Sequence, residues 1–274
     1  MNAMLDTSFS SHANAFAKCL TIDALRERVP AAFAEGAHER TSSKYTFIPT
    51  ERVLNGLMHA GFEPVDARQT RSRCGSPVHA RHVLRLRRRF ETVQLRDSVP
   101  EIVFLNSHDG TSAYQLRMGL YRVVCTNGLI VSRGAFPAYC VPHRGDVVDA
   151  VVTGALEISE RFDLLAAQVQ RMEARPLLPE EQVRFSERAL GLRYPDLAMS
   201  GMQPSALLAY RRYEDRGDDL WSVLNRVQEN LLAGGLLRRA ASGRLARTRR
   251  ITSIREDVRI NSRLWDLAGE ALAA

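Results

Sequence analysis

HARHVLRLRRRF, at residues 79–90, is the stretch of sequence that decides the fold. Its side chains alternate in character, and a period of two is typical of a β-strand with one buried face. The face that we expect to be buried is mostly apolar: Ala80, His82, Leu84, Leu86, Arg88 and Phe90. The opposite face has one valine and four arginines: Arg81, Val83, Arg85, Arg87 and Arg89. We therefore expect a half-buried strand whose solvent-facing side is a row of guanidinium groups.

A second strand-like stretch, FEPVDARQTRSR at residues 62–73, comes just before it. The intervening CGSP has the composition of a turn, so the two stretches predict an antiparallel β-hairpin. The first strand adds three basic residues: Arg68, Arg71 and Arg73. Residues 67–90 contain eight arginines and no acidic residue, so their charges repel unless a polyanion or acids elsewhere compensate them.

Strand patterns fill the first half of the chain and helical patterns the second. EIVFLNS at residues 101–107 predicts a central strand, and Asn127-Gly128 predicts a turn between two further strands. From residue 146 onward apolar residues recur at spacings of three and four, which is the period of helices. This order predicts an α+β fold, with a mixed or antiparallel N-terminal sheet that includes the basic hairpin, followed by a mainly helical C-terminal half.

The domain organisation follows from the same pattern. We expect residues 1–20 to be a flexible arm, residues 21–145 to form the sheet region, and residues 146–274 to form a helical region packed on it as one compact unit. KYTFIPT at residues 44–50 predicts a further strand, with Thr50 as the cap of the next helix.

Helix boundaries in the second half are predicted from caps and prolines. One helix is expected from residue 146 to the break at Pro176, and others over residues 180–190 and 204–213. Asp218 and Asp219 open the next helix, and Ser253 with Glu256 forms a capping-box pattern that begins the last one.

A second basic segment lies at residues 236–255, LLRRAASGRLARTRRITSIR, with seven arginines and no acidic residue. We interpret it as a basic loop between two helices that could follow phosphates, although a solvated linker is also consistent with it. Its candidate contacts are Arg244, Arg247, Arg249 and Arg250.

The formal net charge is only +7, and 36 of the 38 basic residues are arginine, so the clustering is more informative than the total. The nearby aromatic side chains that could stack on bases are Tyr210, Tyr213 and Trp221, and the helical spacing around Trp221 favours core packing for that one.

Other classes of protein are not indicated. The four cysteines form no C-x-x-C pair and match no zinc spacing, and no secretory signal or run of about 20 apolar residues is present, so we expect a cytoplasmic protein without a membrane span. Neither a G-x-G-x-x-G nor a Walker loop occurs, and no cofactor or metal is expected.

One pair of residues suggests chemistry. His108-Asp109 follows the apolar strand, and such a pair can bind a metal or act as a base and its orienting group. Asp109-Gly110 is also a common turn, which is the simpler interpretation. His108 and Asp109 therefore stay as an alternative catalytic pair.

Several segments occur together in an order that resembles a known family. They are FAEGAHERTSSKYTFIPT (33–50), LNSHDGTSAYQLRMGLYRVVCTNGLIV (105–131), VPHRGDVV (141–148), DDLWSVLNRVQENLLAGGL (218–236) and ASGRLARTRR (241–250). Over roughly residues 20–270 the chain resembles the YfjQ/YafZ-type proteins of prophages and plasmids, in domain-of-unknown-function family 932. The resemblance implies a bacterial protein of mobile DNA and supplies no catalytic residues. In outline the order of elements is also similar to single-strand annealing proteins of phages.

These observations predict a non-enzymatic nucleic-acid-binding protein of a mobile element, active in single-strand DNA binding or annealing during recombination. Single-stranded DNA is expected before duplex DNA as the partner, and a second copy of the chain or another protein stays open. Two alternatives remain: a metal-dependent nuclease-like enzyme that uses His108 and Asp109, and an anti-defence module whose arginine face binds an acidic protein.

Overall fold

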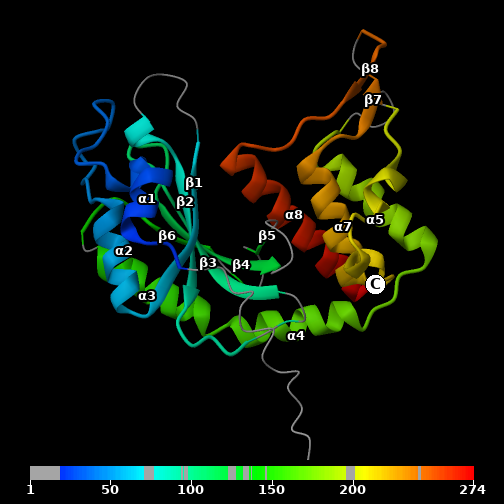
Figure 1. Cartoon of the computed structure of the whole chain (residues 1–274), viewed down its shortest axis with the longest axis horizontal. Coiled ribbons are helices and arrows are strands. Elements are labelled where there is room, and N and C mark those ends of the chain that lie inside the picture. Colours follow the sequence, from blue (N-terminus) through cyan, green and yellow to red (C-terminus); the bar gives the residue numbers. More distant parts are fainter. Residues whose placement is uncertain are drawn as a thin grey trace, which may run out of the picture.

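The computed structural model of the chain places a β-sheet between two helical layers (Figure 1). It describes residues 19–70, 77–93, 95, 98–122, 128–131, 136, 138–145, 147–195, 201–239 and 242–274, without the side chain of residue 214. The predicted α+β class is confirmed, with the sheet in the first half of the chain and most of the helices in the second.

The sheet is antiparallel throughout its described pairs, in the order β1-β2-β3-β4-β5, with β6 pairing with β4 beside β5. Its strands are β1 (Phe62–Gln69), β2 (His82–Arg88), β3 (Ser98–Asn106), β4 (Tyr114–Arg122), β5 (Gly128–Val131) and β6 (Tyr139–Val141). The predicted hairpin is confirmed as the β1–β2 pair, while its turn lies in residues 71–76, outside the described part. β3 is central as predicted, and each of its residues is buried.

Helices from the first half and the start of the second cover one face of the sheet. They are α1 (Ile22–Arg28), α2 (Thr50–His59) and α3 (Val147–Ser159), with short 3-10 helices η1 (Pro30–Phe33) and η2 (Pro77–His79) beside them. The buried side of β2 faces this layer, because His82, Leu84 and Leu86 are fully buried in the main core or its polar rim.

The C-terminal helices form the layer on the other face (Figure 1). α4 (Phe162–Glu173) crosses beneath the sheet to reach them, and the layer consists of α5 (Pro179–Gly191), α7 (Leu220–Ala233) and α8 (Ile254–Ala273), with 3-10 helices η3 (Pro204–Leu208) and η4 (Tyr213–Arg216). α8 contacts the sheet directly through a second, smaller core: Val83, Val103, Leu105, Tyr121, Ile130, Ile254 and Val258. Burying such side chains stabilises the docking by about 1.5–3 kcal/mol each.

Caps set the boundaries of the two helices nearest the sheet. Asp219 accepts a hydrogen bond from the Ser222 backbone at the start of α7, and Ser253 accepts one from the Glu256 backbone at the start of α8, as the sequence predicted. α7 ends at Gly234, whose φ of 71° and close approach to the Arg249 backbone leave no room for a side chain.

Three predicted elements are wrong, each for a local reason. Residues 45–49 form no strand, because the Thr46 amide bonds the carbonyl of His143 in a loop and Pro49 leads straight into α2. The helix from residue 146 breaks after Ser159, whose hydroxyl bonds the Leu156 carbonyl. Residues 204–213 form no α-helix: a 3-10 helix ends at Leu208 and a loop follows, where the side chain of Asn230 bonds the carbonyl groups of Leu207 and Ala209 that a continuing helix would use.

The basic segment 236–255 is also more ordered than the predicted loop. It contains a two-stranded hairpin, β7 (Leu237–Arg239) paired with β8 (Leu245–Arg247), which projects beyond the helical layer in Figure 1. An extended stretch then links β8 to the first turn of α8.

The prediction of a solvent-facing row of arginines on β2 is wrong, because acidic side chains of the neighbouring strands form ion pairs with these arginines. Arg85 Nε lies 2.7 Å from Glu101 Oε2, and Arg87 Nη2 lies 2.7 Å from Glu101 Oε1. The register that pairs Arg85 with Val103 places Glu101 two residues along β3, where both arginines reach it. Arg89 pairs with Glu63 of β1 at 2.8 Å, and α8 packs over this face.

We predict that Glu101→Gln lowers the free energy of unfolding by about 3 kcal/mol or more, because two half-buried guanidinium groups lose their shared carboxylate. Urea denaturation measures it. Glu63→Gln is the matched control, and since the Arg89–Glu63 pair is partly exposed, we expect it to cost less than about 1 kcal/mol. Equal costs for the two variants would contradict the assignment of Glu101 as the buried counter-charge.

Candidate functional site

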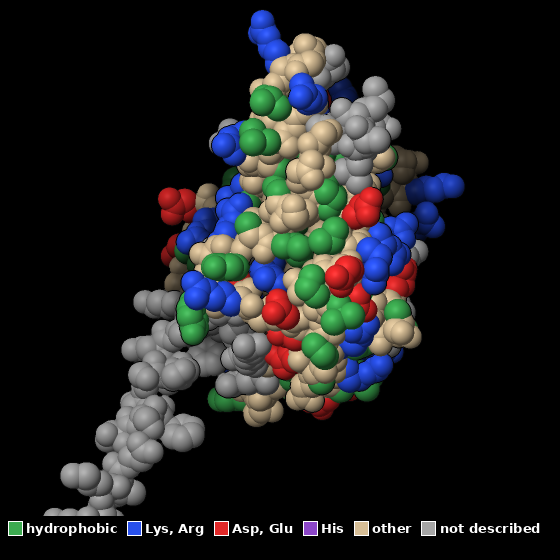
Figure 2. Space-filling view, turned by 90° about the vertical axis from the view of Figure 1, so that its right-hand side faces the viewer, with side chains coloured by type: hydrophobic (Ala, Val, Ile, Leu, Met, Phe, Trp, Pro, Cys, Tyr) green, Lys and Arg blue, Asp and Glu red, His purple; other side chains and the backbone are tan. Residues whose placement is uncertain are grey.

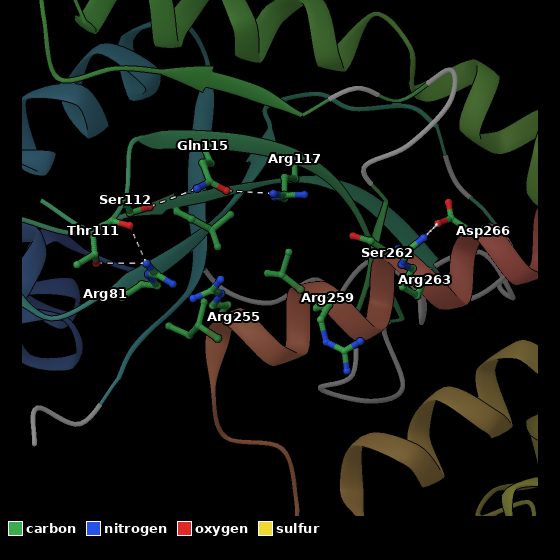
Figure 3. Close-up of a pocket in the computed structure, with 13 residues that line it drawn as sticks. Arg81, Thr111, Ser112, Gln115, Arg117, Arg255, Arg259, Ser262, Arg263 and Asp266 are labelled. Atoms are coloured by element: carbon green, nitrogen blue, oxygen red, sulfur yellow. Dashed lines mark hydrogen bonds and ion pairs between the residues drawn. The ribbon is translucent and has the colours of Figure 1, made fainter. Parts of the chain in front are cut away.

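A cavity lies where α8 meets the sheet, and we call it the α8 groove (Figure 3). Its volume is about 570 Å³. The lining residues come from β3 and β4, from the residues just before β2 and β4, and from one side of α8: Arg81, Leu105, Thr111, Ser112, Gln115, Arg117, Ile254, Arg255, Val258, Arg259, Ser262, Arg263 and Asp266. Five of these side chains are arginines and one is an acid, so the groove is strongly positive.

Two of the five arginines have local acidic partners on α8. Arg259 holds Glu256 with contacts of 2.7 and 2.9 Å, and Arg263 lies 3.6 Å from Asp266 at the far end of the groove. For the other three, Arg81, Arg117 and Arg255, no carboxylate of the described residues forms an ion pair. Figure 3 shows Arg81 and Arg255 together at one end, with Arg117 on the strand opposite α8.

Burial makes this lack of counter-charge costly. The Nε atoms of Arg81 and Arg117 are buried and have no hydrogen-bond partner among the described residues. Burial also lowers the pKa of the Arg117 guanidinium, and no described carboxylate compensates it. An unsatisfied buried donor typically costs about 1–3 kcal/mol, so the folded chain bears this cost at both arginines.

The turn that follows β3 holds Arg81 in place. Arg81 Nη2 donates to the carbonyl and to the hydroxyl of Thr111, at 3.1 and 3.3 Å. Asp109 Oδ1 in turn accepts from the Thr111 amide, the Thr111 hydroxyl and the Ser107 hydroxyl, at 3.0, 2.7 and 2.7 Å. Burial alone would raise the pKa of Asp109, but these hydrogen bonds outweigh it and keep the pKa below its ordinary value.

This arrangement is suited to binding a phosphate group. Guanidinium groups bind phosphate oxygens with paired, charge-assisted hydrogen bonds, and the hydroxyls of Ser112 and Ser262 and the amide of Gln115 add neutral polar groups along the wall. The N-terminus of α8, at Ile254 and Arg255, also lines the groove and adds the positive end of a helix dipole.

A second concentration of arginine lies on the β7–β8 hairpin and the stretch after it. Figure 2 shows basic side chains around the projecting hairpin at the top of the view. Its exposed arginines are Arg238, Arg239, Arg244, Arg247, Arg249 and Arg250. Because residues 248–253 run from β8 into α8, Arg249 and Arg250 lie along the chain between the hairpin and Arg255 in the groove. We call this run, Arg244 to Arg255, the basic track.

The arginines predicted as nucleic-acid contacts separate into four groups. Arg71 and Arg73 lie outside the described residues. Arg85, Arg87 and Arg89 hold acids of neighbouring strands, Arg81 lies in the groove, and the members from the second segment, Arg244, Arg247, Arg249 and Arg250, are exposed on the basic track. Of the described arginines in the two predicted segments, Arg81 and Arg255 line the same groove.

Sequence reasoning missed Arg117 and Arg255. Arg117 lies on the same side of β4 as Gln115 and alternates with apolar residues, which is the ordinary pattern of a half-buried strand. Arg255 lies in the first turn of α8, where a basic residue opposes the helix dipole, and that unfavourable charge is a signal that could have identified it.

Below the groove, a buried polar network joins residues that are distant in sequence. The Thr50 hydroxyl lies 3.0 Å from Nε2 of both His82 and His108, and the Asn106 amide donates to it at 2.9 Å. His143 Nε2 lies 3.1 Å from Asn106 Oδ1. Thr50 was expected to act as a helix cap, but Pro49 occupies the cap position and the Thr50 side chain serves this network.

The hydrogen bond to the Ala80 carbonyl fixes the tautomer of His82, and from it the positions of the other protons in the network follow. It accepts from His82 Nδ1 at 3.0 Å, so neutral His82 must accept the Thr50 proton at Nε2. His108 then donates to Thr50 from Nε2 and can accept from the Tyr45 hydroxyl at Nδ1, 3.4 Å away. Burial lowers the pKa of His82 to about 4, and burial with the neighbouring His82 and His143 lowers the pKa of His108 to about 3, so both rings are neutral near pH 7.

The alternative catalytic pair is not assembled. His108 is fully buried in this network, whereas the Asp109 carboxylate is held by Ser107 and Thr111, and no hydrogen bond joins the two side chains. In the part of the chain that the structure describes, no three His, Cys, Asp or Glu side chains form a group that could hold a metal ion. The hydrogen bonds of Asp109 to Ser107 and Thr111 brace the turn after β3.

Comparison with known proteins gives the family. The chain belongs to the family described as Domain of unknown function (DUF932), whose model matches residues 37–265. Among its relatives is UPF0380 protein YafZ of Escherichia coli (strain K12), which is 42% identical over 254 residues, 92% of this chain and 91% of that protein. UPF0380 protein YfjQ of the same organism is 40% identical over 250 residues, 91% of this chain and 90% of the relative. The resemblance seen in the sequence segments is confirmed. No solved structure gives a significant match.

Among the described residues, no helix combines the length and apolar character needed to cross a membrane.

We predict that Thr50→Val lowers the free energy of unfolding by about 2 kcal/mol, because His82, His108 and Asn106 lose a shared buried partner. Thr46→Val, at an exposed position, is the matched control and should change it by less than about 0.5 kcal/mol. Chemical denaturation at pH 7.5 compares the two. If Thr50→Val leaves the free energy of unfolding unchanged, the network does not stabilise the fold.

We also predict that acid destabilises the protein between about pH 6.5 and pH 4. An unfolded histidine has a pKa near 6.5, whereas folded His82 and His108 have values of about 4 and about 3, so the unfolded state binds more protons in this window. The free energy of unfolding should therefore fall as pH falls, as measured by urea denaturation at several pH values. His108→Gln should flatten the dependence, and His59→Gln, at an exposed position, should leave it unchanged.

Proposed function

We propose that this protein binds single-stranded nucleic acid, with phosphates of the strand in the α8 groove. The observation that supports it most is the convergence of Arg81, Arg117 and Arg255, which have no acidic ion-pair partner among the described residues, in one cavity. A folded chain tolerates this arrangement best if an anion regularly occupies it, since like charges repel and buried donors need partners.

The form of the positive surface favours a polymer over a small anion. The basic track continues from Arg255 through Arg250 and Arg249 to the β7–β8 hairpin, so exposed guanidinium groups follow one line from the groove outward. Residues 247–254 span at most about 25 Å when extended, which is the length of several nucleotides. Phosphates at regular intervals match such a line, whereas a mononucleotide would use only the groove.

The size of the groove favours a single strand. A cavity of about 570 Å³ is in the range of small-ligand sites and admits a short piece of one strand. A double helix does not enter such a space, because its major groove alone is about 12 Å wide.

The same proposal includes the biological setting. Similarity to YfjQ/YafZ-type proteins supports a role on mobile DNA, in single-strand binding or annealing during recombination, and DNA in bacteria implies a cytoplasmic location. The role is binding without catalysis, since Asp109 and His108 serve structural networks. Arginine side chains could instead meet carboxylates of an acidic protein, and the binding test distinguishes that case.

We predict that Arg81→Gln and Arg255→Gln each weaken binding of a labelled single strand about tenfold, because each removes charge-assisted contacts to phosphate. Each should also reduce the slope of log Kd against log salt by about 0.7, the value for one phosphate contact on a single strand. Fluorescence anisotropy over a salt series measures both quantities.

Arg188→Gln is the matched control, because it removes the same charge from an exposed arginine that pairs with Glu270, away from the groove. It should leave affinity and slope nearly unchanged. Equal losses in all three variants would indicate binding through net charge alone. No binding of single-stranded DNA or RNA by the native chain at low salt would contradict the proposed function.

A further inference from the structure

Two exposed aromatic rings lie in one short segment beside the helical layer. Of the described Phe, Tyr and Trp side chains, three are strongly exposed: Phe90, Tyr210 and Tyr213. Tyr213 is 76% exposed and Tyr210 51% exposed, although rings of this size usually pack against the core. Two such rings three residues apart are an unusual surface feature and suggest a binding role.

One arginine packs against both rings. The Arg216 guanidinium carbon lies 4.9 Å from the centre of the Tyr210 ring and 4.8 Å from that of Tyr213. Such cation–π packing fixes the orientation of the rings, and a ring has two faces, so each can still accept a further planar group. We define Tyr210, Tyr213 and Arg216 as the tyrosine platform.

The segment is held in place by buried polar side chains of α7. The Asn230 amide donates to the carbonyls of Leu207 and Ala209 at 3.0 and 2.7 Å, and its oxygen accepts from Arg211 Nε at 2.9 Å. Arg212 makes a two-point contact with Glu229, with both distances 2.7 Å. The rings are therefore presented on an ordered backbone, which reduces the entropy lost when a ligand binds.

The platform and the basic track are anchored to the same turn of α7. Asn230 holds Ala209 next to the platform, and two residues later the Leu232 carbonyl accepts from the Ile251 amide of the track at 2.9 Å. η3 and η4 both pack on α7, whose C-terminal end leads into the β7–β8 hairpin (Figure 1). Phosphate-binding arginines and exposed rings thus flank one structural element.

Residues 210–219 contain three arginines and four acidic residues, so local charge alone does not attract a polyanion to the platform, and the proposal depends on the rings. Asp215, which lies between the rings and Arg216 in sequence, is 2% exposed and is bound by Arg122 at 2.5 Å and Arg212 at 3.5 Å. Its charge is compensated inside the fold. The platform itself contributes one exposed positive charge, that of Arg216.

We propose that the tyrosine platform binds unstacked bases of the same single strand whose phosphates lie in the α8 groove and along the basic track. This inference rests on the proposed function and adds to it the reason for a preference for single strands. Bases offer their faces to an aromatic ring only when they leave the double helix, and stacking of this kind tolerates any sequence. DNA and RNA share the chemistry, so both belong in the test.

The experiment compares native protein with Tyr210→Ala/Tyr213→Ala, using labelled single-stranded DNA, single-stranded RNA and blunt duplex DNA over a salt series. We expect the double variant to bind single strands about tenfold more weakly or worse, because each stacked base adds substantially to affinity. The salt slope should stay unchanged, since no phosphate contact is removed. The loss of affinity in the double alanine variant is compared between single-stranded DNA and single-stranded RNA. The strand type with the larger loss is the one that the platform prefers.

Two further variants control for shape and for exposed aromatic character. Tyr210→Phe/Tyr213→Phe keeps the ring faces and should bind as the native chain does. Phe90→Ala removes the third exposed ring, at the end of β2, and should also leave binding unchanged. Thermal unfolding should be the same for all variants, because the exchanged rings are exposed.

Several outcomes would overturn the platform. They are native affinity in the double alanine variant, equal losses for duplex and single strands, or a changed elution volume in size-exclusion chromatography, which would assign the rings to contact with a second copy. If Arg255→Gln weakens binding while the tyrosine variants do not, the groove stands and only the platform fails. If the native chain binds no nucleic acid, the proposed function fails as well.

Discussion

The buried carboxylate of Glu101 is the charge on which the rest of the structure depends. Arg85 and Arg87 both bind it, and the face of β2 on which they lie can then be covered by α8. Without that counter-charge, docking the helix would bury two guanidinium groups that lack their shared carboxylate, at a cost that opposes the gain from the small core around Val83 and Val103. The α8 groove exists only because the helix docks, so the candidate site is a consequence of this neutralisation.

The same strand also shows what distinguishes an arginine paired with an acid from one in the groove. Arg85, Arg87 and Arg89 lie beside strands β3 and β1, which carry their ion-pair partners Glu101 and Glu63. Arg81 lies just before β2, beyond the reach of those acids. Its contacts are neutral oxygens of Thr111. Neutral acceptors position a guanidinium but do not cancel its charge, and the Asp109 carboxylate, whose pKa the charge of Arg81 helps to lower, forms no ion pair with it.

The buried histidine network supports the site from beneath. His108 and Asp109 are neighbours in sequence but serve different structures, the ring binding Thr50 and the carboxylate bracing the turn that holds Arg81. A pair that suggests catalysis in the sequence thus becomes one buried anchor and one turn. Strand β2 joins the two, since His82 points into the network and Arg81 into the groove.

Much of the fold could be predicted from local patterns, because period, caps and turns act over a few residues. The β1–β2 hairpin, the central β3 and the start of α8 at Ser253 are examples. The wrong elements have distant causes: residues 204–213 stop short of a helix because Asn230, far along the chain, binds their carbonyls. Of the site, the sequence indicated Arg81 and the second basic segment, but Arg117 and Arg255 were missed because their importance lies in what surrounds them.

By itself the sequence determined the α+β order, the family and the concentration of arginine in two segments, since each of these is a property of neighbouring residues. Only the tertiary structure decided which arginines are paired with acids and which line the groove without an acidic ion-pair partner among the described residues. Ion pairing requires groups within about 4 Å, and the acids that meet this distance on β2 come from β1 and β3 through strand register, which no count of charges along the chain reveals.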